Sequence, residues 1–157
     1  MQRRRARNLA RLIDSYKGNE IHLVGHSNGC DLICRALKQI NTPVETIHLI
    51  APATDADFGK NGLNEALCME RLGKVYVYAG ENDWPMKLAY YTGKVLSKIG
   101  LGYGSLGYNG PQNIADEDWV ERRVTFRIYC DYGHSTFFKP QVFHTIMRTI
   151  ALSLCTR

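Results

Sequence analysis

The stretch from Ile21 to Leu37 constrains the fold of this 157-residue chain more than any other part of it. It opens with an apolar run between Ile21 and Val24, continues with the pattern Gly-x-Ser-x-Gly over residues 25–29, and then places apolar residues at helical spacing. An apolar run before such a pattern and a helical repeat after it predict a strand, a sharp turn and a helix.

The turn itself is expected to place Ser27 in an unusual position. A serine on so sharp a turn takes a strained backbone conformation, and bulky residues in place of Gly25 or Gly29 are expected to collide with the strand and the helix. The helix that follows directs the positive end of its dipole at Ser27. A negative charge that forms beside the serine would therefore be stabilised.

The rest of the chain alternates between predicted helices and strands. Such alternation predicts right-handed crossovers, and the nearly continuous apolar strands predict burial on both faces of a sheet. We therefore expect one α/β domain over residues 1–157, with a mostly parallel sheet of about four strands flanked by helices. Helices are predicted at residues 3–16, 28–40, 63–72, 85–99 and 140–154, and strands at 20–25, 46–51, 75–79 and 124–129.

Charge and composition favour an ordinary globular protein. The formal net charge is +5, and the basic excess is concentrated near the start of the chain, at Arg3, Arg4, Arg5 and Arg7. We interpret this cluster as the solvated face of a first helix rather than as a contact for nucleic acid or anionic lipid. No apolar run approaches the length of a membrane span, and no signal-peptide core follows the arginines.

The five cysteines do not form a metal-binding pattern. Their number is odd, no Cys-x-x-Cys occurs, and Cys30 and Cys34 alone are too few for a zinc site. Reduced, mostly buried thiols in a cytoplasmic protein are the expected state. The sequence Gly102-Tyr-Gly-Ser-Leu-Gly107 matches a dinucleotide-binding pattern, but no strand precedes it. We expect neither a metal nor an organic cofactor.

Three predicted strands end in residues that could act together on a carbonyl compound. A serine hydroxyl needs a base to accept its proton and a third group to orient that base. The loops after parallel strands meet at one edge of a sheet, so Ser27, Asp83 and His134 are expected to converge there. Asp55 or Asp57, which follow the second strand, could replace Asp83 as the acid.

The other histidines and the neighbouring aromatic residues have less specific interpretations. We expect His22 and His48 to pack in the core, His26 to be structural, and the helical His144 to be exposed or packed. Trp84 and Tyr132 flank the expected acid and base. They could line a pocket for an acyl group, and they could equally be ordinary core aromatics.

With these residues in place, the chain resembles the α/β-hydrolase family of serine hydrolases. Residues 25–29 match the family's nucleophile elbow, residues 79–83 resemble its acid turn, and residues 132–137 resemble its histidine loop. The resemblance implies Ser27 as nucleophile, His134 as general base and acid, and Asp83 as the orienting acid. It also implies that the backbone N–H of Asn28 stabilises the oxyanion.

The sequence departs from the family pattern before the elbow. Only about twenty residues precede the elbow strand, so the family's earlier strands, and the loop that supplies its second oxyanion donor, are missing. The strand between Ile21 and Val24 is therefore expected to form a sheet edge, open to a partner chain or a second copy.

We expect a serine hydrolase with a truncated α/β-hydrolase-like fold that cleaves a small carboxylic ester or thioester. The first alternative is a binding module that keeps the fold but is catalytically weak or inactive. The second is a basic protein that touches RNA or a membrane through its arginine-rich start.

Overall fold

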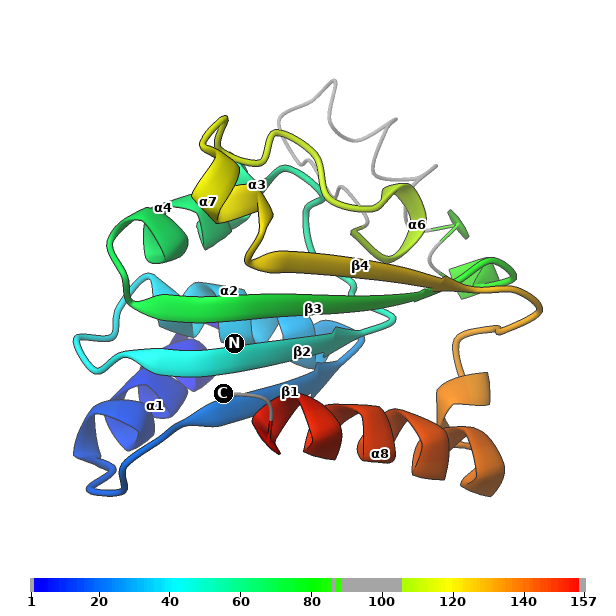
Figure 1. Cartoon of the computed structure of the whole chain (residues 1–157), viewed down its shortest axis with the longest axis horizontal. Coiled ribbons are helices and arrows are strands. Elements are labelled where there is room, and N and C mark those ends of the chain that lie inside the picture. Colours follow the sequence, from blue (N-terminus) through cyan, green and yellow to red (C-terminus); the bar gives the residue numbers. More distant parts are fainter. Residues whose placement is uncertain (1, 86, 89–105, 156–157) are drawn as a thin grey trace.

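The computed structural model describes residues 2–85, 87, 88 and 106–155, and it confirms the predicted fold class (Figure 1). Four strands form one sheet in the order β1-β2-β3-β4, and every neighbouring pair is parallel. Parallel neighbours place the carboxyl ends of all four strands at the same edge. The strands are β1 (His22–His26), β2 (Val44–Ile50), β3 (Leu72–Gly80) and β4 (Val124–Tyr129).

Helices cover both faces of this sheet. Figure 1 shows the early helices behind the sheet and α8 in front of it, and we name these the back and front faces. Helix α8 runs antiparallel to the strands in that view, as expected when a chain returns along a parallel sheet. The helices are α1 (Gln2–Ser15), α2 (Asn28–Leu37), α3 (Phe58–Asn61), α4 (Leu63–Cys68), α6 (Leu106–Asn109), α7 (Asp118–Glu121), the 3₁₀ turn η1 (Thr136–Phe138) and α8 (Pro140–Cys155).

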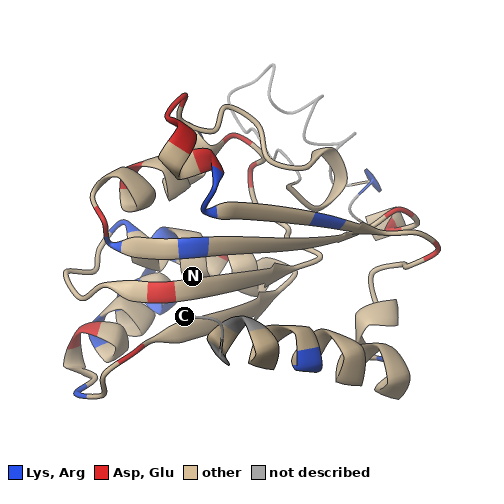
Figure 2. Cartoon of the chain, viewed as in Figure 1, with Lys and Arg blue, Asp and Glu red and all other residues tan. Residues whose placement is uncertain are grey.

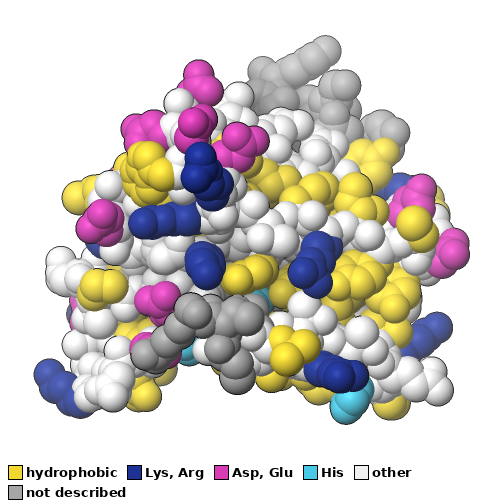
Figure 3. All heavy atoms as spheres, in the orientation of Figure 1, with side chains coloured by type: hydrophobic (Ala, Val, Ile, Leu, Met, Phe, Trp, Pro, Cys, Tyr) yellow, Lys and Arg dark blue, Asp and Glu magenta, His cyan; other side chains and the backbone are white. Residues whose placement is uncertain are grey.

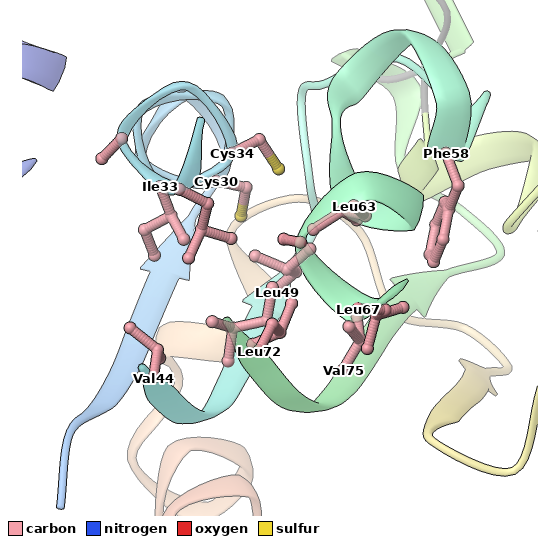
Figure 4. Close-up of a cluster of buried hydrophobic side chains, with 14 of the residues drawn as sticks. Cys30, Ile33, Cys34, Val44, Leu49, Phe58, Leu63, Leu67, Leu72 and Val75 are labelled. Carbon is pink, nitrogen blue, oxygen red and sulfur yellow. The ribbon is translucent and has the colours of Figure 1, made fainter. Parts of the chain in front are cut away.

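The larger core lies on the back face. Figure 4 shows side chains of α2 and α4 packing against Leu49 of β2 and Val75 of β3, all of them buried. Cys30 and Cys34 belong to this core. Burial raises the pKa of the Cys30 thiol and raises that of Cys34 to about 12, so both thiols pack as neutral side chains. Cys68 and Cys130 are exposed, so the expectation of mostly buried thiols fits only half of the described ones.

A second core lies on the front face, beneath α8. Ile146 and Ile150 of α8 pack against Ile50 of β2 and Tyr78 of β3. The segment after β4, which includes η1, delivers the chain to the front face, where α8 packs. In Figure 3 apolar side chains gather over the carboxyl-terminal half of β3 and β4, between separate lysines and arginines.

The first helix differs from its predicted apolar side. The buried residues of α1 are Ala6, Ala10 and Ile13, whereas Leu12 and Tyr16 are exposed. The alanines allow α1 to lie close against α2, and that contact, rather than the larger side chains, decides which side is buried. The arginines at positions 3, 4, 5 and 7 are exposed, which confirms the solvated face. Figure 2 marks the basic residues of the chain in blue on the ribbon.

Several boundaries differ from the prediction. Helix α2 ends at Leu37 instead of residue 40, and strand pairing makes β3 begin at Leu72 instead of residue 75. The helix expected to reach residue 72 ends at Cys68, and Leu72 already pairs with Val44 of β2. The loop after β2 contains the short helix α3, and α7 was not expected. The helix predicted at 85–99 and the glycine pattern at 102–107 lie mostly outside the described residues. Of the helices that are described, none is long and apolar enough to cross a membrane.

The predicted sheet edge is confirmed. Within the part of the chain that the structure describes, β1 pairs with β2 alone. Val24 in the middle of β1 is 48% exposed. The elbow strand is therefore an outer strand of the sheet, although α1 lies close by behind the sheet.

Candidate active site

The turn between β1 and α2 holds Ser27 in a strained backbone conformation. Its φ of 53° and ψ of −121° lie in a region that a residue with a side chain rarely adopts and that costs about 1–3 kcal/mol. Ser27 N–H donates to the carbonyl of Ile50 at 3.0 Å, and the Ser27 carbonyl accepts from the N–H groups of Cys30 and Ala53. These bonds to β2, to α2 and to the loop after β2 hold the serine at the carboxyl edge of the sheet.

The two glycines of the turn have different roles. A Cβ on Gly25 would lie 2.8 Å from Cδ1 of Ile33, closer than real side chains approach, so Gly25 allows α2 to pack against β1. A Cβ on Gly29 would meet nothing within 4 Å. The predicted collision is therefore supported by the contacts at Gly25 and was wrong at Gly29.

His134 lies between Ser27 and Asp83. Its Nε2 is 3.0 Å from Oγ of Ser27, and its Nδ1 is 2.9 Å from Oδ2 of Asp83. An ionised carboxylate only accepts hydrogen bonds, so Nδ1 carries the proton and donates it to Asp83. Nε2 then has a free lone pair that can accept the hydroxyl proton of Ser27. The three residues come from turns after β1, β3 and β4 and meet as the parallel topology predicts.

The side chains of Asp83 and His134 differ in burial. The Asp83 side chain is fully buried, whereas that of His134 is 19% exposed. A buried carboxylate beside the ring favours one ring orientation and stabilises a positive charge on it.

Close backbone packing brings the acid turn and the histidine loop together. A Cβ on Gly80 would collide with the backbone carbonyl of Tyr132, so a side chain at this position would separate the two segments. The N–H of Asn82 donates to the same carbonyl at 3.1 Å. The N–H of Gly133 donates to Oγ1 of Thr136 at 3.0 Å, which closes the histidine loop onto η1.

The two alternative acids, Asp55 and Asp57, bond to groups other than His134. Oδ1 of Asp57 accepts from the N–H groups of Gly59 and Lys60 and caps α3, while its Oδ2 accepts from the side chain of Asn113. Oδ1 of Asp55 accepts from the N–H of Asp57. The structure thus places Asp83, and neither Asp55 nor Asp57, against His134.

The remaining predicted site residues differ in exposure and packing. Asn28 is exposed and begins α2, so its N–H belongs to the first turn, where backbone donors have no partner within the helix. Trp84 is 67% exposed and does not pack in the core. Tyr132 stacks on Tyr129 at a centroid distance of 5.1 Å and meets Phe137 edge-on, so its ring packs against the core on the front face.

The other histidines lie as expected in outline. His48 is fully buried, His22 is half-buried and bonded to Thr46, and His144 is exposed. His26 contacts His134 directly. Nothing in the sequence indicated this contact, because the two histidines are 108 positions apart and only the fold brings them together.

The support of Ser27 by Ile50 and Ala53 was also not predicted. It uses only backbone atoms, so no residue type marks it. A cleft bordered by Glu45, Lys74 and Arg123 lies at the amino ends of the strands, away from Ser27. No group of three or more potential metal ligands occurs among the described residues.

Comparison with known proteins gives no relative for this chain. No family model matches it, and searches of curated proteins and of solved structures find no match. Any functional proposal therefore rests on the geometry of the site.

Proposed function

We propose that this protein is a serine hydrolase with an α/β-hydrolase-like fold, which cleaves a carboxylic ester or thioester. The observation that carries the proposal is the continuous hydrogen-bonded series from Asp83 through His134 to Ser27. A fully buried acid, an imidazole of fixed orientation and a strained serine are the three parts that acyl transfer requires.

In the proposed reaction, Oγ of Ser27 attacks the carbonyl carbon while its proton passes to Nε2 of His134. The negative oxygen that results accepts from the N–H of Asn28 at the positive end of α2. Collapse of this intermediate breaks the bond to the leaving alcohol or thiol, which takes the proton from Nε2. An acyl group then remains on Ser27.

Water completes the cycle in the same way. His134 accepts a proton from the water as its oxygen attacks the acyl carbon, and returns that proton to Oγ of Ser27 as the acid leaves. Asp83 stays ionised and stabilises the imidazolium in both halves. The proposed reaction uses no metal or organic cofactor, and we place it in the cytoplasm, where reduced thiols such as Cys68 and Cys130 persist.

One observation favours a second candidate, a binding module with little or no activity. Within the described residues no strand lies outside β1, so no loop from such a strand supplies a second N–H to the oxyanion. Loss of one such donor lowers kcat by roughly 10²–10³-fold.

A fluorophosphonate probe distinguishes the two candidates. We expect the wild-type protein to be labelled at Ser27 and to hydrolyse p-nitrophenyl acetate. Ser27→Ala should abolish labelling and lower kcat by up to about 10⁶-fold. Ser15→Ala, which changes an exposed serine of α1, is the matched control and should behave as wild type.

Labelling that survives Ser27→Ala would contradict the proposed nucleophile. A folded wild-type protein that is never labelled would favour the binding module.

A further inference from the structure

The side chain of His26 reaches the backbone of the histidine loop. His26 is the last residue of β1, and its Nε2 lies 3.3 Å from the carbonyl oxygen of His134. A carbonyl oxygen is an acceptor, so Nε2 carries the proton and donates it. His26, which directly precedes Ser27, therefore bonds to the backbone of His134, the residue that faces Ser27.

The His26 ring also packs between two parts of the same loop. Its centroid is 4.8 Å from that of the His134 ring, and 4.5 Å from that of Phe138, which meets it edge-on. Phe138 in turn stacks on Phe143 of α8. The His26 ring thus contacts both His134 and the 3₁₀ turn η1 that follows it.

The histidine loop is held from a second side by the acid turn. There the N–H of Asn82 donates to the carbonyl of Tyr132, two residues before His134. The carboxylate of Asp83 holds one ring nitrogen of His134. These contacts hold His134 against β3. The bond from His26 ties the backbone of the same loop directly to β1, the strand that precedes the nucleophile.

We propose that His26 is a positioning residue that fixes the distance between His134 and Ser27 by binding the His134 carbonyl from the elbow strand. This inference rests on the proposed hydrolase function. It concerns the alignment of base and nucleophile, in which a displacement of about 1 Å can lower the rate by 10²-fold.

The charge state of His26 is compatible with this role. Burial lowers the pKa of His26, the bond to the His134 carbonyl partly opposes that effect, and a positive charge on the His134 ring lowers it further. Asp83 is the other charged group that acts on it, and it raises the pKa. His26 is therefore neutral at pH 7, and no second positive charge opposes the imidazolium that His134 becomes.

Two substitutions separate the hydrogen bond from the packing. His26→Phe keeps an aromatic ring against Phe138 but removes the donor, whereas His26→Gln keeps an N–H donor of similar reach. We expect His26→Phe to lower both the fluorophosphonate labelling rate and kcat by roughly 10- to 100-fold, with a much smaller change in KM. His26→Gln should recover most of that loss. His144→Phe, on the exposed side of α8, is the matched control.

A double substitution tests whether His26 acts through His134. In a His134→Ala background, His26→Phe should change the residual hydrolysis by less than about twofold, because the group that it positions is gone. A merely structural role would lower the residual rate by the same factor in both backgrounds.

The inference is overturned if His26→Phe retains the wild-type rate, if His26→Gln is as impaired as His26→Phe, or if the two losses multiply. These outcomes are separate from a failure of the hydrolase proposal, which would be seen in wild type and in Ser27→Ala before His26 is changed.

Discussion

Two hydrogen-bonded networks in this protein each centre on a histidine, and they differ in what the histidine bonds to. In the first, which we name the Ser27 network, His134 bridges Asp83 and Ser27. In the second, the Tyr78 network, His48 bridges the hydroxyl of Tyr78 at 3.0 Å and that of Thr46 at 3.3 Å.

The Tyr78 network extends across three strands on the front face. Thr46 also bonds Nδ1 of His22 at 2.8 Å, and His48 stacks on Tyr76 with the two rings 6° from parallel. His48 is fully buried. Burial, with a smaller effect of His22, lowers the pKa of His48 to about 4, so the ring is neutral near pH 7.

The comparison shows that the bonding partners of a histidine and its place in the fold decide whether its ring suits proton transfer or packing. His134 lies at the carboxyl edge of the sheet, partly exposed, beside a carboxylate that stabilises its charged form. His48 lies within the sheet, where burial penalises the charged form of the ring and a positive charge on His22 disfavours it further. The first environment suits proton transfer, and the second suits a fixed polar core.

Removing the carboxylate from the Ser27 network should have the largest effect of the three changes considered next. Asp83→Asn should lower kcat for p-nitrophenyl acetate by about 10⁴-fold, because an amide can donate to Nδ1 and favour the wrong tautomer of His134. The matched change Asp57→Asn affects the cap of α3 and the contacts with Asn113 and Lys60, none of which involves His134, and should alter kcat by less than about threefold.

Steady-state kinetics of both variants at equal folded concentration make the measurement. A large loss in Asp57→Asn beside a nearly normal Asp83→Asn would show that the two aspartates had been assigned the wrong way round.

Acid pH should act on the Tyr78 network through stability. His48 takes up a proton near pH 6.5 when unfolded and only near pH 4 when folded, so the unfolded state binds more protons between these values. The free energy of unfolding should therefore fall as pH drops from 7 to 4, with about 3 kcal/mol of that loss due to His48.

Urea unfolding at several pH values measures this slope in wild type and in His48→Gln. The variant should be less stable at pH 7 and should lose less stability towards pH 4. His144→Gln, at an exposed position, should keep the wild-type slope. Equal slopes in wild type and His48→Gln would show that His48 is not kept neutral by the fold.

The smallest effect is expected at β1, the strand that contributes to both networks. Ile21 C=O and Ser27 N–H bond towards β2, so the alternation along the strand directs the N–H and C=O of Val24 outwards. We predict that this edge pairs with a second copy or another chain, and that the purified protein self-associates.

Val24→Lys should weaken that association by roughly tenfold while changing the free energy of unfolding by about 0.5 kcal/mol or less. Ile128→Lys, on the exposed opposite edge at β4, is the matched control. Sedimentation velocity measures both. A wild-type protein that stays monomeric at high concentration would show that the edge is protected without a partner.

The sequence alone determined the fold class and the order of the elements near the site. Apolar runs separated by helical patterns predicted a mostly parallel sheet of about four strands, and the strand at residues 124–129 was predicted with its observed bounds. The pattern Gly-x-Ser-x-Gly identified Ser27, because a sharp, strained turn requires small residues nearby and these can be recognised in the sequence. Asp83 and His134 follow later strands, and their convergence with Ser27 was expected because parallel strands end at one edge of the sheet.

Only the tertiary structure decided between Asp83 and its rivals, since Asp55 and Asp57 also follow a strand and differ only in what their carboxylates bond. It likewise decided the end of α4, where pairing with β2 converts the end of a helical pattern into β3. The contact of His26 with His134 joins residues 108 positions apart through a backbone atom. Local sequence determines which segments form strands, turns and helices. The hydrogen bonds of a side chain depend on residues that the fold brings near it, and such long-range contacts leave no periodic pattern in the sequence.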